Sequence, residues 1–81
     1  LTHSTIIAHN VTLKSFTTIG SRSSILGNSK IGKGVFIGAN VLIGENIRVG
    51  DYSRVIIGTS LFKSIKNKHM VFGNPIKILK L

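Results

Sequence analysis

Residues 31–50 read Ile-Gly-Lys-Gly-Val-Phe, Ile-Gly-Ala-Asn-Val-Leu, Ile-Gly-Glu-Asn-Ile-Arg, Val-Gly, which is a six-residue repeat. Steps of six from the first residue reach an aliphatic side chain every time, at Leu1, Ile7, Leu13, Ile19, Ile25, Ile31, Ile37, Ile43, Val49, Val55 and Leu61. Such a run is far beyond chance in a chain that is 42% hydrophobic. A fixed short period of this kind predicts a solenoid in which each repeat packs on the next.

The other positions of the hexad predict which part is strand and which part is corner. If the aliphatic residue is position one, glycine recurs at position two, and Asn or Gly, which tolerate a positive φ, recurs at position four. Position five is small or β-branched. Positions five, six and one therefore form a short strand with side chains in, out and in, and positions two to four form a tight corner. Three hexads close a triangle, which gives an all-β parallel β-helix with 18 residues per coil and strands about 4.8 Å apart.

The position-six side chains point outward and define three faces. One face carries Ile6, Ser24, Leu42 and Ser60, a second carries Thr12, Lys30 and Arg48, and a third carries Thr18, Phe36 and Arg54. The second face is typical of a solvated surface. Exposed apolar residues on the other two favour packing against neighbouring subunits. We therefore expect a homotrimer, in which each triangular coil buries two faces against its neighbours and leaves one face exposed to solvent.

The repeat predicts one β-helical domain over residues 1–61, followed by a loop and a C-terminal cap over 62–81. Residues 64–69 are polar and rich in lysine, and the segment from Ile76 to Leu81 alternates apolar residues with lysine, so we expect it to cover the open end of the prism. The chain starts without Met inside the repeat, which favours a C-terminal fragment of a longer protein. It has no cysteine, and no apolar run approaches the roughly 20 residues of a membrane span.

The charge is strongly basic, with eleven Lys and Arg against two acidic residues and a net charge of +9. A polyanionic partner and a solvated surface both fit this balance. The basic residues are scattered, no aromatic platform accompanies them, and no nucleic-acid motif is present. We therefore expect no nucleic-acid partner.

Together these motifs resemble the hexapeptide-repeat acyltransferases, which are left-handed parallel β-helices. Gly73-Asn74-Pro75-Ile76-Lys77 is similar to the Gly-Asn-Pro-Ala-Lys ending of that superfamily. The segment Ile6-Ile7-Ala8-His9-Asn10-Val11, followed by Ile25-Leu26-Gly27-Asn28-Ser29-Lys30-Ile31-Gly32, is most similar to one branch of it. That branch holds the sialic acid O-acetyltransferases and the N-acetyltransferases of nucleotide-linked amino sugars.

The resemblance implies a cytoplasmic enzyme that moves acetyl from acetyl-CoA to an amine or hydroxyl of a sugar, with no metal. It makes His9 the general base. Asn10 stands where the family has an acidic residue, although Asn also recurs at this corner position for backbone reasons. The resemblance places the pantetheine arm of acetyl-CoA along Gly27 and Gly58 and its phosphates near Lys77. The 18-residue register independently stacks His9 on Gly27, whose backbone N–H is our candidate oxyanion donor; a simple tight turn is the alternative interpretation of this glycine.

Other functions stay in competition at this point. A catalytically inactive trimeric β-helix scaffold is favoured by Asn10 and by the apparent truncation. A γ-type carbonic anhydrase would need three histidines that converge on zinc, but His3, His9 and His69 fall at different corners or in the loop. An ice-binding solenoid would need a threonine ladder, which Lys30 and Arg48 interrupt. The acceptor, and the choice between O- and N-transfer, stay open.

Overall fold

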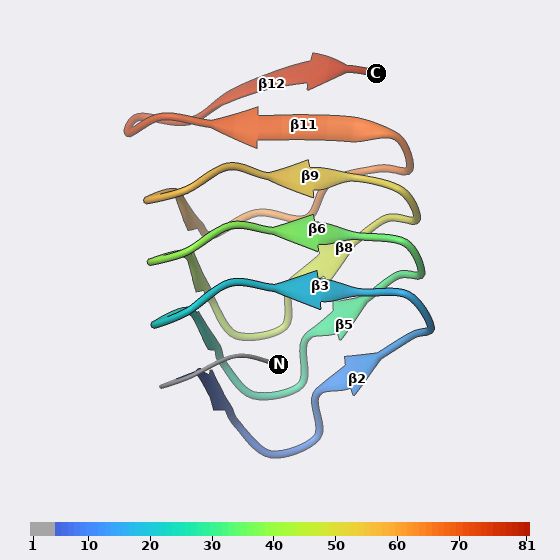
Figure 1. The fold of residues 1–81 in the computed structure, drawn as a ribbon, viewed down its shortest axis with the longest axis vertical. Coiled ribbons are helices and arrows are strands. Elements are labelled where there is room, and N and C mark those ends of the chain that lie inside the picture. The colour runs from blue at the N-terminus through green and yellow to red at the C-terminus, as the bar shows by residue number, and fades with distance from the viewer. Residues whose placement is uncertain (1–4) are drawn as a thin grey trace.

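The six-residue period forms a triangular coil of short parallel strands in the computed structural model, which describes residues 5–81 (Figure 1). Leu1 and His3 lie outside the described residues. The first sheet contains β1 (Ile6–Ile7), β4 (Ser24–Ile25), β7 (Leu42–Ile43) and β10 (Ser60–Leu61). The second sheet contains β2 (Thr12–Leu13), β5 (Lys30–Ile31) and β8 (Arg48–Val49). The third contains β3 (Thr18–Ile19), β6 (Phe36–Ile37), β9 (Arg54–Val55), β11 (His69–Phe72) and β12 (Lys77–Lys80).

The strand register confirms the predicted all-β parallel β-helix with 18 residues per coil. Ile6 pairs with Ser24, Thr12 with Lys30, and Thr18 with Phe36, so each of the three predicted faces belongs to one sheet. The position-one side chains point inward. From Ile19 to Leu61 every one of them is at most 2% exposed, and they form one continuous apolar core.

The corners share one backbone conformation. Position four has a positive φ at all nine places from residue 10 to residue 58: Asn10, Phe16, Arg22, Asn28, Gly34, Asn40, Asn46, Tyr52 and Gly58. Asparagine and glycine adopt this left-handed region at little cost, which explains their recurrence. Phe16, Arg22 and Tyr52 adopt it as well, so the geometry of the coil overrides local preference at those three positions.

Position two is glycine where the next coil lies too close for a Cβ atom. At Gly38 a Cβ would lie 2.7 Å from the backbone nitrogen of Ile57. Backbone atoms of a packed coil cannot move aside, so only glycine fits there.

Serine at position five links successive coils from inside the prism. The Ser23 hydroxyl donates to the Gly38 carbonyl at 2.7 Å and accepts from the Val41 N–H at 3.1 Å. Ser29 makes the same pair of bonds with Gly44 and Ile47. Both serines are fully buried, and these bonds satisfy a polar group that would otherwise be costly in the core.

The repeat continues past residue 61, which corrects the predicted loop over residues 64–69. Ile65 is 6% exposed and bridges to Val49, and Val71 pairs with Val55, so both are sixteen residues above their partners, by subtraction of the paired numbers. Ile65 and Val71 are again six apart. The last coil is therefore the same hexad pattern after a loss of two residues next to Ser64, whose hydroxyl accepts the Arg48 N–H at 2.9 Å.

The C-terminal strand lengthens a sheet and does not fold across the open end of the prism as predicted. β12 pairs antiparallel with β11 at the edge of the third sheet (Figure 1), and all four of its residues are exposed. Ile76, just before β12, packs against the core and is the part of this segment that covers it. Within residues 5–81, no helix is long and apolar enough to cross a membrane.

Candidate functional site

The corner between the first and second sheets brings His9 and Gly27 together. His9 is exposed at the turn after β1, and Gly27 occupies the same position one coil later. A Cβ atom on Gly27 would lie 3.4 Å from both Cε1 and Nε2 of the His9 ring. The Asn28 N–H donates to the His9 carbonyl at 3.2 Å and locks the two turns in register. The imidazole of His9 therefore lies over the bare backbone of Gly27, as the register predicted.

The Gly27 backbone has a free donor at this corner. Its carbonyl accepts the Asn46 N–H at 3.0 Å, whereas its own N–H makes no hydrogen bond within residues 5–81. At the next corner two of the three equivalent amides are occupied, because the Lys33 N–H donates to Asp51 Oδ1 at 3.0 Å and the Asp51 N–H donates to Asn67 Oδ1 at 2.8 Å, whereas the Ser15 N–H has no acceptor among residues 5–81. An unpaired N–H beside an imidazole has the composition of an oxyanion-stabilising site next to a base.

Asn10 has a backbone role that accounts for its identity. Its φ is 59°, like that of every other position-four residue, and its side chain makes no hydrogen bond to His9 in the described part of the chain. The one glutamate, Glu45, is exposed at the same corner, one coil beyond Gly27. Residues 5–81 thus contain no carboxylate bonded to the His9 ring.

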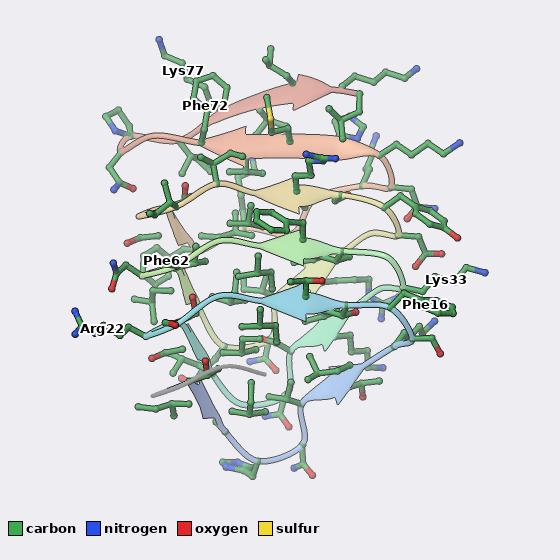
Figure 2. All side chains as sticks on the ribbon, viewed as in Figure 1. Phe16, Arg22, Lys33, Phe62, Phe72 and Lys77 are labelled. Atoms are coloured by element: carbon green, nitrogen blue, oxygen red, sulfur yellow. The ribbon has the colours of Figure 1, made fainter. Side chains whose placement is uncertain are left out.

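Gly58 and Lys77 lie elsewhere, at the far side of the first sheet from His9 and at its C-terminal end. Gly58 has φ 77°, and a Cβ on it would meet nothing within 4 Å, so its outer side is open. Its carbonyl accepts the Asn74 side-chain amide at 3.0 Å, and Asn74 Oδ1 accepts the Ser60 N–H at 3.3 Å. Lys77 is exposed at the start of β12, directly after this turn (Figure 2).

A cavity of about 380 Å³ lies beside this turn, and the sequence did not predict it. It is lined by Ser60, Phe62, Lys63, Asn74, Pro75 and Ile76. The Phe62 ring lies where a Cβ on Gly44 would be, 2.8 Å from its Cδ1 atom, so glycine at position 44 makes room for one wall. The Gly-Asn-Pro motif was the available signal for this site, since Asn74 is the residue that ties the turn to the coil.

The remaining described histidine is fixed far from this corner. His69 Nδ1 donates to the Asn67 carbonyl at 2.8 Å, because a carbonyl can only accept, and Nε2 is left as the basic nitrogen. Among residues 5–81, no three His, Cys, Asp or Glu side chains are grouped so that they could hold a metal ion.

Comparison with known proteins bears on the fold. Residues 28–55 match the family model described as bacterial transferase hexapeptide (six repeats). A mutant of perosamine N-acetyltransferase from Caulobacter crescentus, in complex with CoA and GDP-perosamine, superposes with a TM-score of 0.67 at 15% identity over 94% of this chain and 50% of that one. Serine acetyltransferase from Neisseria gonorrhoeae gives 0.61 at 24% identity, over 94% of this chain and 38% of that one. A maltose O-acetyltransferase from Clostridium difficile superposes with a TM-score of 0.58 at 19% identity, over 95% of this chain and 58% of that one.

No curated protein matches the sequence. The chain spans between 38% and 58% of the length of these three structures, so the likeness concerns their β-helical part. At identities below 25% it establishes the fold. The chain therefore carries the bacterial transferase hexapeptide repeat and has the left-handed β-helix fold that these three acetyltransferases share.

Proposed function

We propose that this chain is the β-helical part of an acetyltransferase that moves acetyl from acetyl-CoA to a hydroxyl or amine of a sugar. The observation that carries the proposal is the first corner, where the exposed His9 imidazole lies 3.4 Å from the Cβ position of Gly27 and the Gly27 N–H is unpaired. The matched hexapeptide model and the acetyltransferase neighbours support the reaction class. Two of those neighbours are named for sugar substrates, which supports a sugar as acceptor.

In this proposal His9 acts as the general base. Its imidazole takes the proton from the acceptor oxygen or nitrogen as that atom attacks the thioester carbonyl; the C–S bond then breaks, and the departing CoA thiolate takes the proton from the imidazolium. The negative charge that develops on the carbonyl oxygen needs a fixed donor, and the Gly27 N–H supplies it without reorganisation. Asn10 holds the turn in its left-handed conformation and so fixes the backbone from which His9 projects.

The residues present fit acetyl-CoA along the first sheet. Gly27 and Gly58 flank this sheet at its two corners; the outer side of Gly58 is open, whereas Gly27 is buried beneath the His9 ring. The cavity beside Asn74 and Phe62 lies at its C-terminal end. Lys77 is exposed beyond that cavity and offers a cation for phosphate, in a chain whose net charge is +9.

We further propose that three copies associate through the first and third sheets. Ile6 is 61% exposed on the first sheet and Phe36 is 43% exposed on the third, whereas the second sheet presents Lys30 and Arg48. Exposed apolar side chains of this size favour burial between subunits. The monomer mass is 8.7 kDa, and sedimentation analysis of the purified chain should give three times that mass. A monomer at micromolar concentration would contradict this assembly.

A second function, a trimeric scaffold without catalysis, is favoured by one observation. Within residues 5–81 the His9 ring has no carboxylate partner to orient it or to stabilise its protonated form. The scaffold shares the proposed fold and assembly and differs in having no acetyl transfer.

The test is release of free CoA from acetyl-CoA in the presence of a panel of hydroxyl and amino sugars, with mass spectrometry of the products. The chain should acetylate at least one sugar, and His9→Ala should lower the rate by about 10²–10⁴-fold, the contribution of a positioned base. His69→Ala is the matched control and should keep full activity toward these monomeric sugars, because His69 lies outside the first corner. Full activity in His9→Ala would overturn the mechanism, and no transfer by the folded wild type would favour the scaffold.

A further inference from the structure

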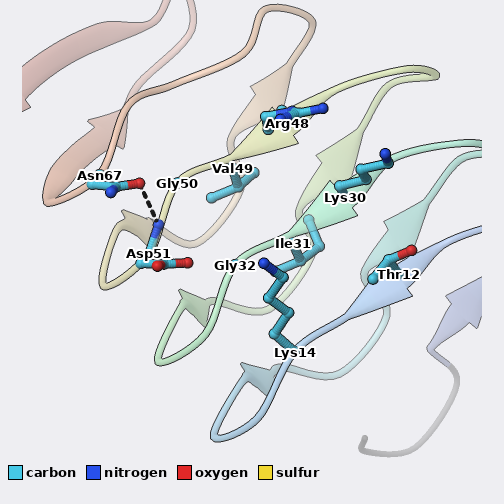
Figure 3. A pocket seen from close by; sticks show the side chains of 10 residues that line it. All are labelled: Thr12, Lys14, Lys30, Ile31, Gly32, Arg48, Val49, Gly50, Asp51 and Asn67. Carbon is cyan, nitrogen blue, oxygen red and sulfur yellow. Dashed lines mark hydrogen bonds between the residues drawn. The ribbon is translucent and has the colours of Figure 1, made fainter.

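The second sheet presents a continuous basic surface that the proposed acetyl transfer does not use. Lys30 and Arg48 are register partners on β5 and β8, so their side chains stand side by side about 4.8 Å apart, and Thr12 lies below them (Figure 3). A cavity of about 230 Å³ at this face is lined by Lys14, Lys30, Arg48 and Asp51 among others. We call this surface, with Lys66 at its upper end, the basic face.

The basic face continues upward onto the irregular last coil. A second, open cavity of about 680 Å³ shares Arg48, Gly50 and Asn67 with the first and adds Lys66 and His69. The one carboxylate here, that of Asp51, accepts the Lys33 N–H and so is committed to the corner. The other acidic residue of the chain, Glu45, is at a different corner. Lys30 and Arg48 therefore form one row along the helix axis, and Lys14 and Lys66 lie at the adjoining corner, so four cations share this face with a single carboxylate, that of Asp51.

Two aromatic rings border this face at the corner between the second and third sheets. Phe16 is 89% exposed and Tyr52 is 51% exposed, and both have a positive φ, of 64° and 58°. Gly34 lies between them in the stack, and the Tyr52 ring rests against it, with Cδ1 2.5 Å from where a Cβ would be. Lys33 projects beside Phe16 (Figure 2). Phe16 and Tyr52 thus present two separate exposed rings at this corner, one coil to either side of Gly34.

Both residues occupy position four of the hexad, where the positive φ favours asparagine or glycine. A bulky residue in the left-handed region is strained by about 1–2 kcal/mol, and an exposed ring gains little burial energy in return. Arg22 adopts the same conformation, so the backbone follows the coil, and what distinguishes Phe16 and Tyr52 is the exposure of their rings beside the basic face.

We propose that the basic face and the Phe16–Tyr52 corner bind an acidic glycan, a sugar polymer that carries carboxylate or phosphate groups. Repeated cations along one axis suit an anion on successive sugar units, and aromatic rings at the edge suit the apolar faces of sugar rings. The two rings are two coils apart with Gly34 between them, so they do not offer the unbroken stack that successive bases of a single-stranded nucleic acid use. The choice of a glycan rests on the proposed sugar acetyltransferase, for which this face would hold the acceptor polymer.

The test measures binding of polygalacturonate to the chain, with neutral dextran and a thymidine oligonucleotide as comparison ligands. The chain should bind polygalacturonate and not dextran. The double variant Lys30→Glu/Arg48→Glu should weaken binding by about tenfold or more, since the cations act at close range. The matched control, Arg22→Glu/Lys80→Glu, changes the net charge equally at two exposed residues away from the basic face, and should weaken binding less than about threefold. Phe16→Ala/Tyr52→Ala should lose the part of the binding that survives high salt.

Three results would overturn the proposal. Equal loss in the two charge-reversal variants would mean that only net charge matters. Tighter binding of the oligonucleotide with the same dependence on Lys30 and Arg48 would make this a nucleic-acid surface. If Phe16→Ala/Tyr52→Ala left binding at high salt unchanged, the two rings would have no part in recognising the sugar units. Calorimetry with acetyl-CoA on the same variants keeps the two proposals apart, because failure of acetyl-CoA binding with intact glycan binding would remove the acetyl transfer alone.

Discussion

The regular coils of residues 5–61 and the final segment of residues 62–81 are built from the same hexad, and they differ in how each coil is covered. In the regular part every inward group meets its equivalent one coil later, so Ile25 lies on Ile43 and the Ser29 hydroxyl is shared with Gly44 and Ile47. In the final segment the period shortens by two residues, and side chains take over backbone roles, as when Ser64 accepts the Arg48 N–H.

The difference shows at the level of single hydroxyl groups. Thr59 occupies the position-five site at the top of the stack that contains Ser23, and it is 1% exposed. Ser23 has two partners, whereas Thr59 Oγ1 is buried without one among residues 5–81. The chain leaves the coil above Thr59 for the Gly-Asn-Pro turn. The polar groups inside a repeat protein therefore find hydrogen-bond partners in the neighbouring coils, whereas a polar group at its end can lack one because the next repeat is missing.

The largest expected effect comes from the core. Ile37→Ala, at a fully buried site, should lower the free energy of unfolding by about 2–5 kcal/mol through lost burial and the cavity left behind. Leu79→Ala on β12, where the side chain is 50% exposed, should cost less than about 0.5 kcal/mol. Urea denaturation measures both. Equal costs would mean that β12 is buried against another surface in solution.

The second prediction separates two glycines. Gly38→Ala should cost about 3 kcal/mol, because its Cβ would press on the backbone nitrogen of Ile57 in the next coil. Gly27→Ala should change stability by less than about 0.5 kcal/mol, since its Cβ would only touch the flexible His9 ring at 3.4 Å. A thermal or urea unfolding series on both variants checks this. A large loss in Gly27→Ala would assign that glycine to the fold instead of the site.

The third prediction tests the hydroxyl comparison directly. Ser29→Ala should cost about 2 kcal/mol, because the Gly44 carbonyl and the Ile47 N–H each lose a buried partner. Thr59→Val keeps the shape and removes an unpaired oxygen, so it should raise stability by about 1 kcal/mol. Chemical denaturation of the two variants gives the answer. Destabilisation by Thr59→Val would mean that its hydroxyl is bonded in solution.

The smallest effect concerns the attachment of the last segment. Asn74→Ala removes exposed hydrogen bonds to Gly58 and Ser60 and should cost about 1 kcal/mol. Hydrogen exchange should quicken at residues 69–80 and stay unchanged in β4 to β8, because the regular coils do not depend on this turn. Uniformly faster exchange would show that the end and the coils unfold as one unit.

The sequence predicted the regular coils because their geometry repeats. One inward aliphatic per hexad was enough to set the strands, the three faces and the alignment of His9 with Gly27. The sequence did not reveal the coil at residues 62–69. The period there is two residues short, and the intervening lysines obscure the six-residue spacing from Ile65 to Val71. The sequence also missed the positive φ of Phe16 and Tyr52, since the stacked neighbours impose that conformation and the residues themselves do not favour it.

The candidate site was predictable where it follows the register and unpredictable where it depends on the end of the coil. The free N–H of Gly27 requires knowledge of every neighbouring acceptor, and the cavity beside Asn74 exists only because the chain turns back at Pro75. The roles of His9, Asn10, Gly27, Gly58 and Lys77 stay predictions.

The central claim, that the first sheet and its corners form an acetyl-CoA site, is tested most directly by calorimetric titration of acetyl-CoA into the chain and into His9→Ala. We predict one site per chain with micromolar affinity, retained in His9→Ala because the base acts on the acceptor, and weakened in Lys77→Ala through loss of a phosphate contact. No binding to a protein shown to be folded and assembled would contradict the claim and leave a β-helical scaffold.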